Sequence, residues 1–227
     1  MSGETFTSGG KPHKITIYPP PADGKKHSMV LVLHGNAGLN PPFANQIHRF
    51  ANDLAGHGYL AAVPQYYYDD VSHPQDGDPR PHVQALCDAI AMLAARANAD
   101  PGRLGLVGYS LGAATAMTYI ASNAAGKVKV LVDFFGPIEG NAAIASGVAK
   151  FPPTMMLHNE QDAIVGFKAN SEALNRLLPS SVEHKLVTYK EDLPQYGFHP
   201  FKEGGPADVD SRAQATAWVL KHLQPTN

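Results

Sequence analysis

The sequence is poor in cysteine, with Cys87 alone among its 227 residues. A single cysteine cannot form a disulfide within the chain, and it cannot build a cysteine-based metal cluster. Cys87 lies within an expected amphipathic helix, so we interpret it as a small buried hydrophobic residue. The cysteine content therefore indicates neither a disulfide scaffold nor a metal site.

Positive charge is scarce as well. The 18 lysines and arginines are outnumbered by 20 acidic residues, which gives a net charge of −2, and the basic residues form no cluster. A protein that follows a nucleic-acid backbone needs such a cluster to neutralise phosphates. The charge balance therefore excludes nucleic acid as a partner and favours a small neutral or anionic substrate.

Long apolar runs are also missing. No stretch approaches the ~20 apolar residues that a membrane span requires. Residues 1–10 have neither the basic start nor the apolar centre of a signal peptide. We therefore expect no membrane partner, a cytoplasmic location and one domain over residues 1–227, present as a monomer or a homodimer.

Along the chain, short continuous apolar runs alternate with segments whose apolar residues recur at helical spacing. Short apolar runs predict strands at residues 14–18, 28–33, 59–63, 104–107, 129–136, 153–158 and 184–189, the first of them at a sheet edge. Helical spacing predicts helices at residues 44–58, 82–98, 113–120, 141–149, 167–178 and 210–223. This alternation is typical of an α/β fold with a doubly wound, mostly parallel sheet.

The chain is organised around residues 108–112, Gly-Tyr-Ser-Leu-Gly. The pentapeptide lies between a predicted strand and a predicted helix, which is the context of a nucleophile elbow. Glycines two residues either side of Ser110 avoid collisions with neighbouring backbone at such a tight turn. We therefore predict Ser110 as a nucleophile and the amide of Leu111 as an oxyanion donor. A glycine-rich turn without chemistry is the alternative for the pentapeptide alone.

Polar groups that follow the other strands should meet Ser110, because ligands bind beyond the carboxyl ends of parallel strands. His199 follows the last predicted strand and is the candidate base, and Asp162 follows the strand before it and is the candidate orienting acid. The order Ser110, Asp162, His199 is the order of α/β-hydrolase triads. The alternatives are Glu160 and Asp133 as acids, and His158, His184 and His222 as bases.

A second oxyanion donor is expected in residues 34–38, His-Gly-Asn-Ala-Gly, directly after a buried strand. Gly35 and Gly38 allow this loop to come close, so the amide of Asn36 or Ala37 is the predicted donor. We interpret the side chain of His34 as structural.

Residues 65–81 form a long loop that is aromatic first and then acidic and interrupted by prolines. Loops of this length in a compact domain are usually functional or mobile, so we place it at the mouth of the site. Tyr66, Tyr67 and Tyr68 are candidates for lining a substrate pocket, and Arg80 is a candidate for anchoring a carboxylate.

Four segments in this order resemble the α/β-hydrolases, and within them the dienelactone hydrolase-like group of small enzymes. They are residues 34–38 (HGNAG), 108–112 (GYSLG), 158–165 (HNEQDAIV) and 197–201 (GFHPF). The resemblance implies an α/β-hydrolase fold without a large cap, a triad of Ser110, Asp162 and His199, and no cofactor. Dienelactone hydrolases proper have a cysteine where this chain has Ser110, which favours ordinary ester hydrolysis. Pro200 replaces the glycine usual after the base and stiffens that loop.

These observations predict a serine hydrolase that cleaves small carboxylic esters through an acyl-enzyme. A peptidase or an acyltransferase with the same triad is one alternative. A binding protein that uses the hydrolase fold without catalysis is another, although all three triad positions carry competent side chains.

Overall fold

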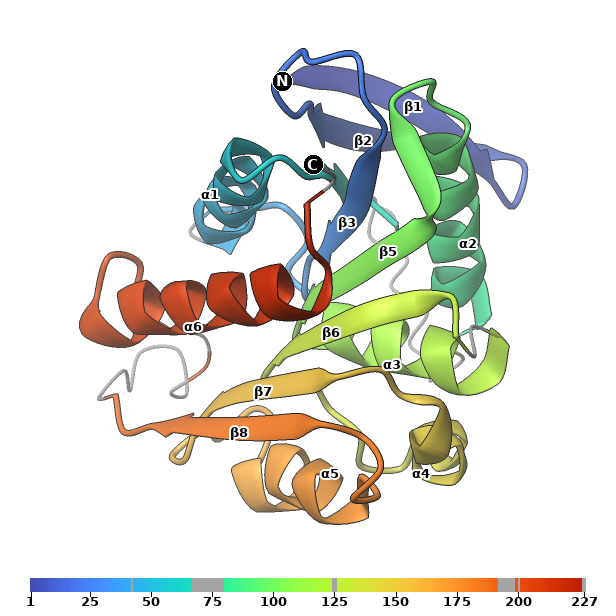
Figure 1. The fold of residues 1–227 in the computed structure, drawn as a ribbon. Helices are drawn as coiled ribbons and strands as arrows, with labels where there is room; N and C mark the ends of the chain where they lie inside the picture. Colours follow the sequence, from blue (N-terminus) through green and yellow to red (C-terminus); the bar gives the residue numbers. More distant parts are fainter. Residues whose placement is uncertain (42, 67–79, 124–125, 192–198, 200, 226–227) are drawn as a thin grey trace.

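A computed structural model of the chain shows one eight-stranded sheet between two layers of helices (Figure 1). The structure describes residues 1–41, 43–66, 80–123, 126–191, 199 and 201–225. The strands are β1 (Ser2–Ser8), β2 (Lys11–Tyr18), β3 (His27–Leu33), β4 (Leu60–Pro64), β5 (Ala99–Tyr109), β6 (Val128–Phe134), β7 (Thr154–Asn159) and β8 (His184–Tyr189). The helices are α1 (Phe43–Gly56), α2 (Arg80–Ala94), α3 (Leu111–Asn123), α4 (Ala142–Gly147), α5 (Ser171–Leu177) and α6 (Pro206–His222), with short 3-10 helices η1 (Val148–Lys150) and η2 (Phe167–Ala169).

The strand order in the sheet is β1-β2-β4-β3-β5-β6-β7-β8. All neighbours from β4 to β8 are parallel, whereas β2 pairs antiparallel with both β1 and β4. The structure thus confirms the α/β class and the mostly parallel sheet expected from the sequence. Parallel strands require crossover connections, which the helices supply.

The prediction that residues 14–18 form the edge strand of the sheet is wrong. Residues 14–18 belong to β2, and β1 pairs with this strand outside it, from Ser2 opposite Ile17 to Ser8 opposite Lys11. β1 is mostly exposed and buries only Phe6 and Ser8. Such a weak apolar pattern explains why the sequence did not reveal it.

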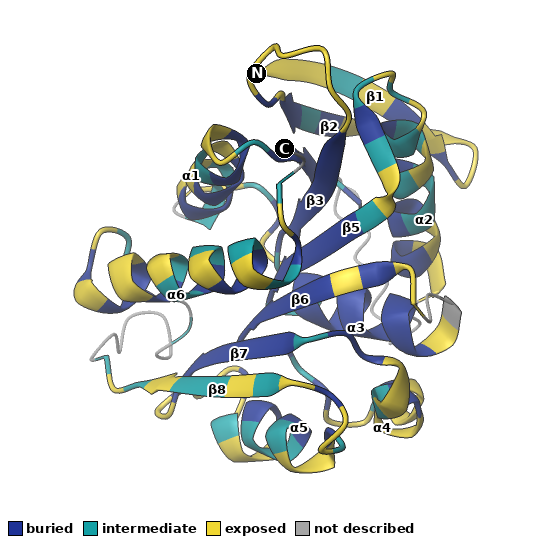
Figure 2. Cartoon of the chain, viewed as in Figure 1, coloured by how far each residue is buried: buried dark blue, intermediate teal, exposed yellow. Residues whose placement is uncertain are grey.

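Helices cover both faces of the sheet. Helices α1 and α6 pack on one face, and α2 to α5 lie on the other (Figure 1). The central strands are consequently buried on both sides, with every residue of β3 buried, whereas the outer strand β8 retains exposed residues (Figure 2). This coverage accounts for the continuously apolar sequence of the central strands.

β5 lies between β3 and β6 and is longer than the sequence predicted. The predicted turn at residues 100–103 is present as an irregularity, because the pairing with β3 moves from Ser28 opposite Asp100 to Met29 opposite Leu104. Beyond this point the pairing is regular up to Gly108. The central position of β5 therefore delivers Ser110 to the middle of the carboxyl edge of the sheet.

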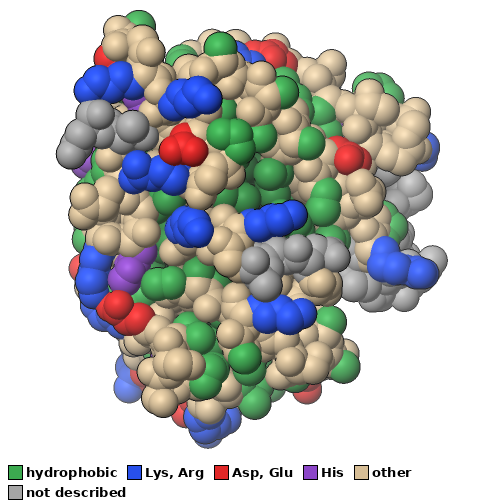
Figure 3. All heavy atoms as spheres, turned by 45° about the vertical axis from the view of Figure 1, so that its right-hand side comes forward, with side chains coloured by type: hydrophobic (Ala, Val, Ile, Leu, Met, Phe, Trp, Pro, Cys, Tyr) green, Lys and Arg blue, Asp and Glu red, His purple; other side chains and the backbone are tan. Residues whose placement is uncertain are grey.

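The distribution of charge on the surface and the character of the helices are relevant to nucleic-acid and membrane partners. On the face shown in Figure 3, the lysine and arginine side chains are dispersed among neutral and acidic groups. Within the described ranges, no helix combines the length and apolarity needed to cross a membrane.

Candidate active site

Ser110 occupies the tight turn between β5 and α3. Its φ of 53° lies in the left-handed region, which non-glycine residues rarely adopt. The Ser110 amide donates to Phe134 O at 2.8 Å, and the amide of Ala113 donates to Ser110 O at 2.9 Å. The serine is therefore held in a strained conformation by backbone bonds on both sides, as expected for a nucleophile elbow.

The glycines around the serine are required by close approaches of backbone. A Cβ on Gly108 would lie 2.3 Å from Ala113 N, and one on Gly112 would lie 2.5 Å from Leu33 O. Real Cβ atoms do not approach backbone so closely. The two glycines thus let helix α3 start directly against β5 and against the end of β3.

Replacing Gly112 with alanine is expected to destabilise the fold by about 3 kcal/mol or more, because its methyl group would collide with backbone and not with a movable side chain. Urea denaturation measures this loss. The matched control is Gly3→Ala, since a Cβ there meets no atom within 4 Å and stability should stay near that of the wild type. Equal stability of the two variants would contradict the close packing of α3 against β3.

The loop after β3 passes directly over the serine. A Cβ placed on Gly35 would lie 3.1 Å from Ser110 Cβ. Gly38 has φ of 67° and its amide donates to Gly35 O at 3.0 Å, which closes a tight turn around Asn36 and Ala37. Gly35 at the start of this turn thus packs against Ser110, the residue before Leu111. The Leu111 amide is at the first position of α3 and has no acceptor within the helix. The two predicted sources of oxyanion donors thus lie on the same side of the sheet.

Tyr66 differs from the substrate-facing position expected for it. Its side chain is 1% exposed, its hydroxyl donates to His34 O at 2.6 Å, and its ring stacks on the imidazole of His34 at 4.5 Å. Tyr66 therefore supports the loop over Ser110 from beneath. Arg80 is exposed at the first position of α2, whereas Tyr67 and Tyr68 lie outside the described residues.

Asp162 lies in the turn after β7 and is buried. Its Oδ1 accepts hydrogen bonds from the amides of Ile164 and Val165, both at 2.8 Å. Its Oδ2 lies 2.5 Å from His199 Nδ1 and 3.2 Å from His158 Nε2. Burial alone would raise the pKa of Asp162, but the two imidazoles and the Val165 amide outweigh it and hold the pKa at about 2. The carboxylate is therefore ionised over the whole physiological range.

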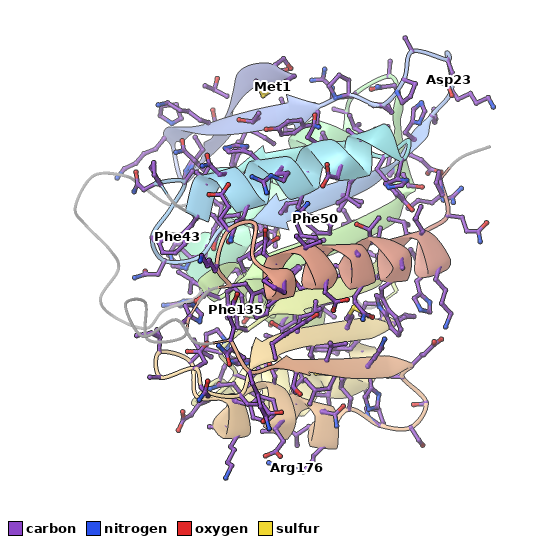
Figure 4. All side chains as sticks on the ribbon, turned by 90° about the vertical axis from the view of Figure 1, so that its left-hand side faces the viewer. Met1, Asp23, Phe43, Phe50, Phe135 and Arg176 are labelled. Atoms are coloured by element: carbon purple, nitrogen blue, oxygen red, sulfur yellow. The ribbon has the colours of Figure 1, made fainter. Side chains whose placement is uncertain are left out.

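His199 contacts Asp162 through Nδ1, and its side chain is 12% exposed. The edge of its ring packs against the ring of Phe135 at a centroid distance of 4.5 Å. Phe135, labelled in Figure 4, follows β6 with φ of 47° and its amide donates to Leu157 O. An imidazole whose Nδ1 is bound to a carboxylate keeps Nε2 for proton transfer.

The structure also separates the candidates that the sequence left open. Glu160 accepts a hydrogen bond from Thr188 at 2.8 Å and pairs with Lys190, so its carboxylate is engaged away from His199. Asp133 lies inside β6 and its Oδ1 accepts from the Gly136 amide. Of the competing histidines, His158 contacts Asp162, whereas His184 is bound to Val182 O and His222 lies 3.6 Å from Glu183. Among these acids, Asp162 is the one that contacts His199.

The segment after His199 is anchored by residues that the sequence did not suggest. Gln46 of α1 donates to Phe201 O at 2.8 Å, and Arg49 of α1 pairs with Glu203 at 2.7 Å. On the other side, Glu191 accepts from the Lys202 amide at 3.0 Å. These partners are far apart in the sequence, so no local pattern could have linked them to the base.

Asp133 is a fully buried carboxyl whose Oδ2 has no hydrogen-bond partner among the described residues. Burial raises the pKa of Asp133 to about 7, against the smaller opposing effects of His158 and the Gly136 amide. The folded state therefore binds a proton more tightly than the unfolded state, so the free energy of unfolding falls as pH rises from about 4 to about 7.

Replacing Asp133 with asparagine is expected to reduce this pH dependence, because the amide oxygen keeps the bond to Gly136 and carries no charge. Thermal unfolding followed at about pH 5 and about pH 8 should show a smaller difference in Tm than in the wild type. The exposed Glu139→Gln variant is the control and should leave the difference unchanged. An unchanged difference in the Asp133 variant would contradict the raised pKa.

Among residues 1–41, 43–66, 80–123, 126–191, 199 and 201–225, no group of three or more His, Cys, Asp or Glu side chains could hold a metal ion.

Comparison with models of known protein families shows which family the chain belongs to. The sequence model of the dienelactone hydrolase family matches residues 13–223, which is nearly the whole chain. The chain belongs to the dienelactone hydrolase family. Comparison with curated proteins gives no significant match.

Solved structures of the same fold include several esterases. Est2 of Thermogutta terrifontis with bound butyrate has a TM-score of 0.77 and 16% identity, with 100% of this chain and 96% of that chain covered. Est1E from Butyrivibrio proteoclasticus has a TM-score of 0.75 and 14% identity over 98% and 99% of the chains. A puromycin-hydrolysing peptidase from Mycobacterium tuberculosis has a TM-score of 0.74 and 17% identity, but only 39% of that chain is covered. At these identities the likeness shows the α/β-hydrolase fold. Membership of the dienelactone hydrolase family supports hydrolase activity.

Proposed function

We propose that this member of the dienelactone hydrolase family is a serine esterase that cleaves carboxylic esters of small molecules. The observation that carries the proposal is the 2.5 Å contact between His199 Nδ1 and the buried carboxylate of Asp162. Ser110, held at φ of 53°, follows β5 at the carboxyl edge of the same sheet. An imidazole oriented by a carboxylate is the group that activates a serine hydroxyl in such a triad, and the proposal places His199 in this role toward Ser110.

In the first half-reaction, Ser110 Oγ attacks the ester carbonyl while His199 Nε2 takes the hydroxyl proton. The negative charge moves to the carbonyl oxygen, where the amide of Leu111 and that of Asn36 or Ala37 stabilise it. The tetrahedral intermediate collapses, the bond to the alcohol breaks, and His199 returns its proton to the leaving oxygen. The products of this half-reaction are the free alcohol and an acyl ester on Ser110.

In the second half-reaction, His199 removes a proton from water, and the resulting hydroxide attacks the acyl carbon. Collapse of the second tetrahedral intermediate releases the carboxylic acid and returns the proton to Ser110. Asp162 keeps His199 in the tautomer with hydrogen on Nδ1 and stabilises the imidazolium formed in both steps. No cofactor takes part in this sequence.

The substrate class is tested by measuring hydrolysis of activated esters of graded acyl length, together with one lactone, one ester that carries a carboxylate and one aminoacyl amide. Esters should be cleaved fastest, and an added alcohol should not accept most of the acyl group. Preferred cleavage of the amide would favour a peptidase, and efficient transfer to the alcohol would favour an acyltransferase.

A fluorophosphonate probe tests the nucleophile independently of the substrate. Labelling is expected at Ser110 and is located by mass spectrometry of the modified peptide. Absence of both labelling and hydrolysis would favour a binding protein that uses the hydrolase fold.

A further inference from the structure

His158 is a second imidazole on the carboxylate that binds His199. It lies at the end of β7, and its side chain is fully buried. Its Nε2 is 3.2 Å from Asp162 Oδ2 and 2.9 Å from Val165 O, and its Nδ1 is 2.6 Å from Ser171 Oγ at the start of α5. The side chains of His199, Asp162, His158 and Ser171 thus form one continuous chain of polar contacts from the site into the core.

The positions of the hydrogens follow from the partners. Nε2 of His158 faces two oxygens that can only accept, the carboxylate of Asp162 and the carbonyl of Val165, so this nitrogen carries the hydrogen. Nδ1 then has a free lone pair, and the hydroxyl of Ser171 donates to it. The acceptor oxygens of Asp162 and Val165 therefore set the tautomer of His158, and the Ser171 hydroxyl anchors the ring through Nδ1.

Asp162 consequently faces four donors, of which the N–H of His158 is shared with Val165 O. Its Oδ1 accepts two backbone amides, and its Oδ2 is shared between His199 and His158. A carboxylate oxygen that accepts from two imidazoles has a fixed direction and gives less of its charge to either one.

We propose that His158 is a positioning residue, which fixes Asp162 Oδ2 toward His199 and limits how strongly the carboxylate stabilises the protonated base. The inference rests on the proposed function of Ser110 and His199 and extends it to a fully buried residue that acts through Asp162. The other groups that face His158 are the buried carboxyl of Asp133 on β6 and the rings of Phe135 and Phe167.

The test compares two replacements of similar size. His158→Leu removes the donor, so kcat is expected to fall about tenfold to a hundredfold, as for other partners that orient a reacting group, with KM nearly unchanged. Because Asp162 then gives its full charge to the protonated base, the acidic limb of the pH profile of kcat/KM should move to higher pH. His158→Gln offers an amide N–H at a position similar to Nε2 and should recover most of the lost turnover.

Two variants control for packing and folding. His184→Leu removes a histidine whose Nδ1 contacts Val182 O, remote from Asp162, and should keep wild-type kcat and pH profile. Ser171→Ala keeps the His158 imidazole but removes the hydroxyl that anchors it through Nδ1, so it should shift the same limb even if the leucine variant does not fold. Equal losses for leucine and glutamine at position 158, with an unmoved pH limb, would mean that the imidazole only fills space and would overturn the proposal.

A measurement without substrate separates this inference from the proposed function. NMR titration of the labelled His199 ring gives its pKa in the wild type, in His158→Leu and in Ser171→Ala. A raised pKa in both variants supports the role of His158 whether or not esters are cleaved, and an unchanged pKa contradicts it. Failure of the wild type to cleave any ester or to react with the fluorophosphonate would instead refute the esterase assignment.

Discussion

Replacing Ser110 with alanine is expected to lower kcat for ester hydrolysis by about 10⁶-fold, the loss typical of a triad nucleophile. The methyl group offers no oxygen for the acyl-enzyme, and no other described hydroxyl occupies the strained turn at the end of β5. Turnover of an activated ester with purified protein, extended to long reaction times, measures the residual rate.

The fold should survive this substitution, because the hydrogen bonds that hold the turn come from the backbone of residue 110. Far-UV circular dichroism and Tm should therefore match those of the wild type. Ser146→Ala, which removes an exposed hydroxyl on α4, is the matched control and should keep full activity. Turnover by the Ser110 variant at a rate near that of the wild type would remove the basis for the proposed mechanism.

Replacing Asp162 with asparagine is expected to lower kcat by about 10⁴-fold, because an amide in place of Oδ2 presents N–H groups to His199 and favours the wrong tautomer. The amide oxygen can keep the bonds to Ile164 and Val165, so the turn itself should form. Steady-state kinetics measures the loss, and Glu160→Gln on the same loop is the control. A similar loss in both variants would point to a general disturbance of the loop.

The same substitution has a consequence for stability with a defined sign. The pKa of Asp162 is lowered to about 2 in the folded protein, so its stabilising contribution is present above the ordinary pKa of about 4 and is lost as pH falls toward 2. The wild type should therefore exceed the asparagine variant in Tm most clearly near neutral pH, and the difference should shrink below about pH 4. A Tm difference that is constant down to about pH 2 would contradict the lowered pKa.

Much of the fold was predictable from local patterns. The continuously apolar strands, the helical spacing and the glycines around Ser110 each follow from packing against immediate neighbours. Element ends were less accurate, since the helix expected at residues 210–223 is α6 at Pro206–His222 and the one expected at 82–98 is α2 at Arg80–Ala94. Ends depend on capping contacts with other segments, which one sequence does not display.

The residue types of the site were predictable from the sequence, but the contacts between their side chains were not. The order of Ser110, Asp162 and His199 suggested a triad, and the structure brings Asp162 and His199 into contact. The second imidazole on Asp162 was missed because His158 was considered as a competing base, and not as a partner of the acid. The direction of the Tyr66 side chain was predicted wrongly for a related reason. It depends on the hydrogen bond to His34 O, which the sequence does not display.

Nucleophile and base differ in how they are attached to the protein. Ser110 follows a strand paired on both sides, whereas the segment after His199 is joined to its surroundings by the side chains of Gln46, Arg49 and Glu191. Side-chain bonds of this kind open individually, while a central strand is released only when the whole sheet melts. On heating, the enzyme should thus lose turnover at temperatures where the sheet is still intact, and brief cooling should restore it.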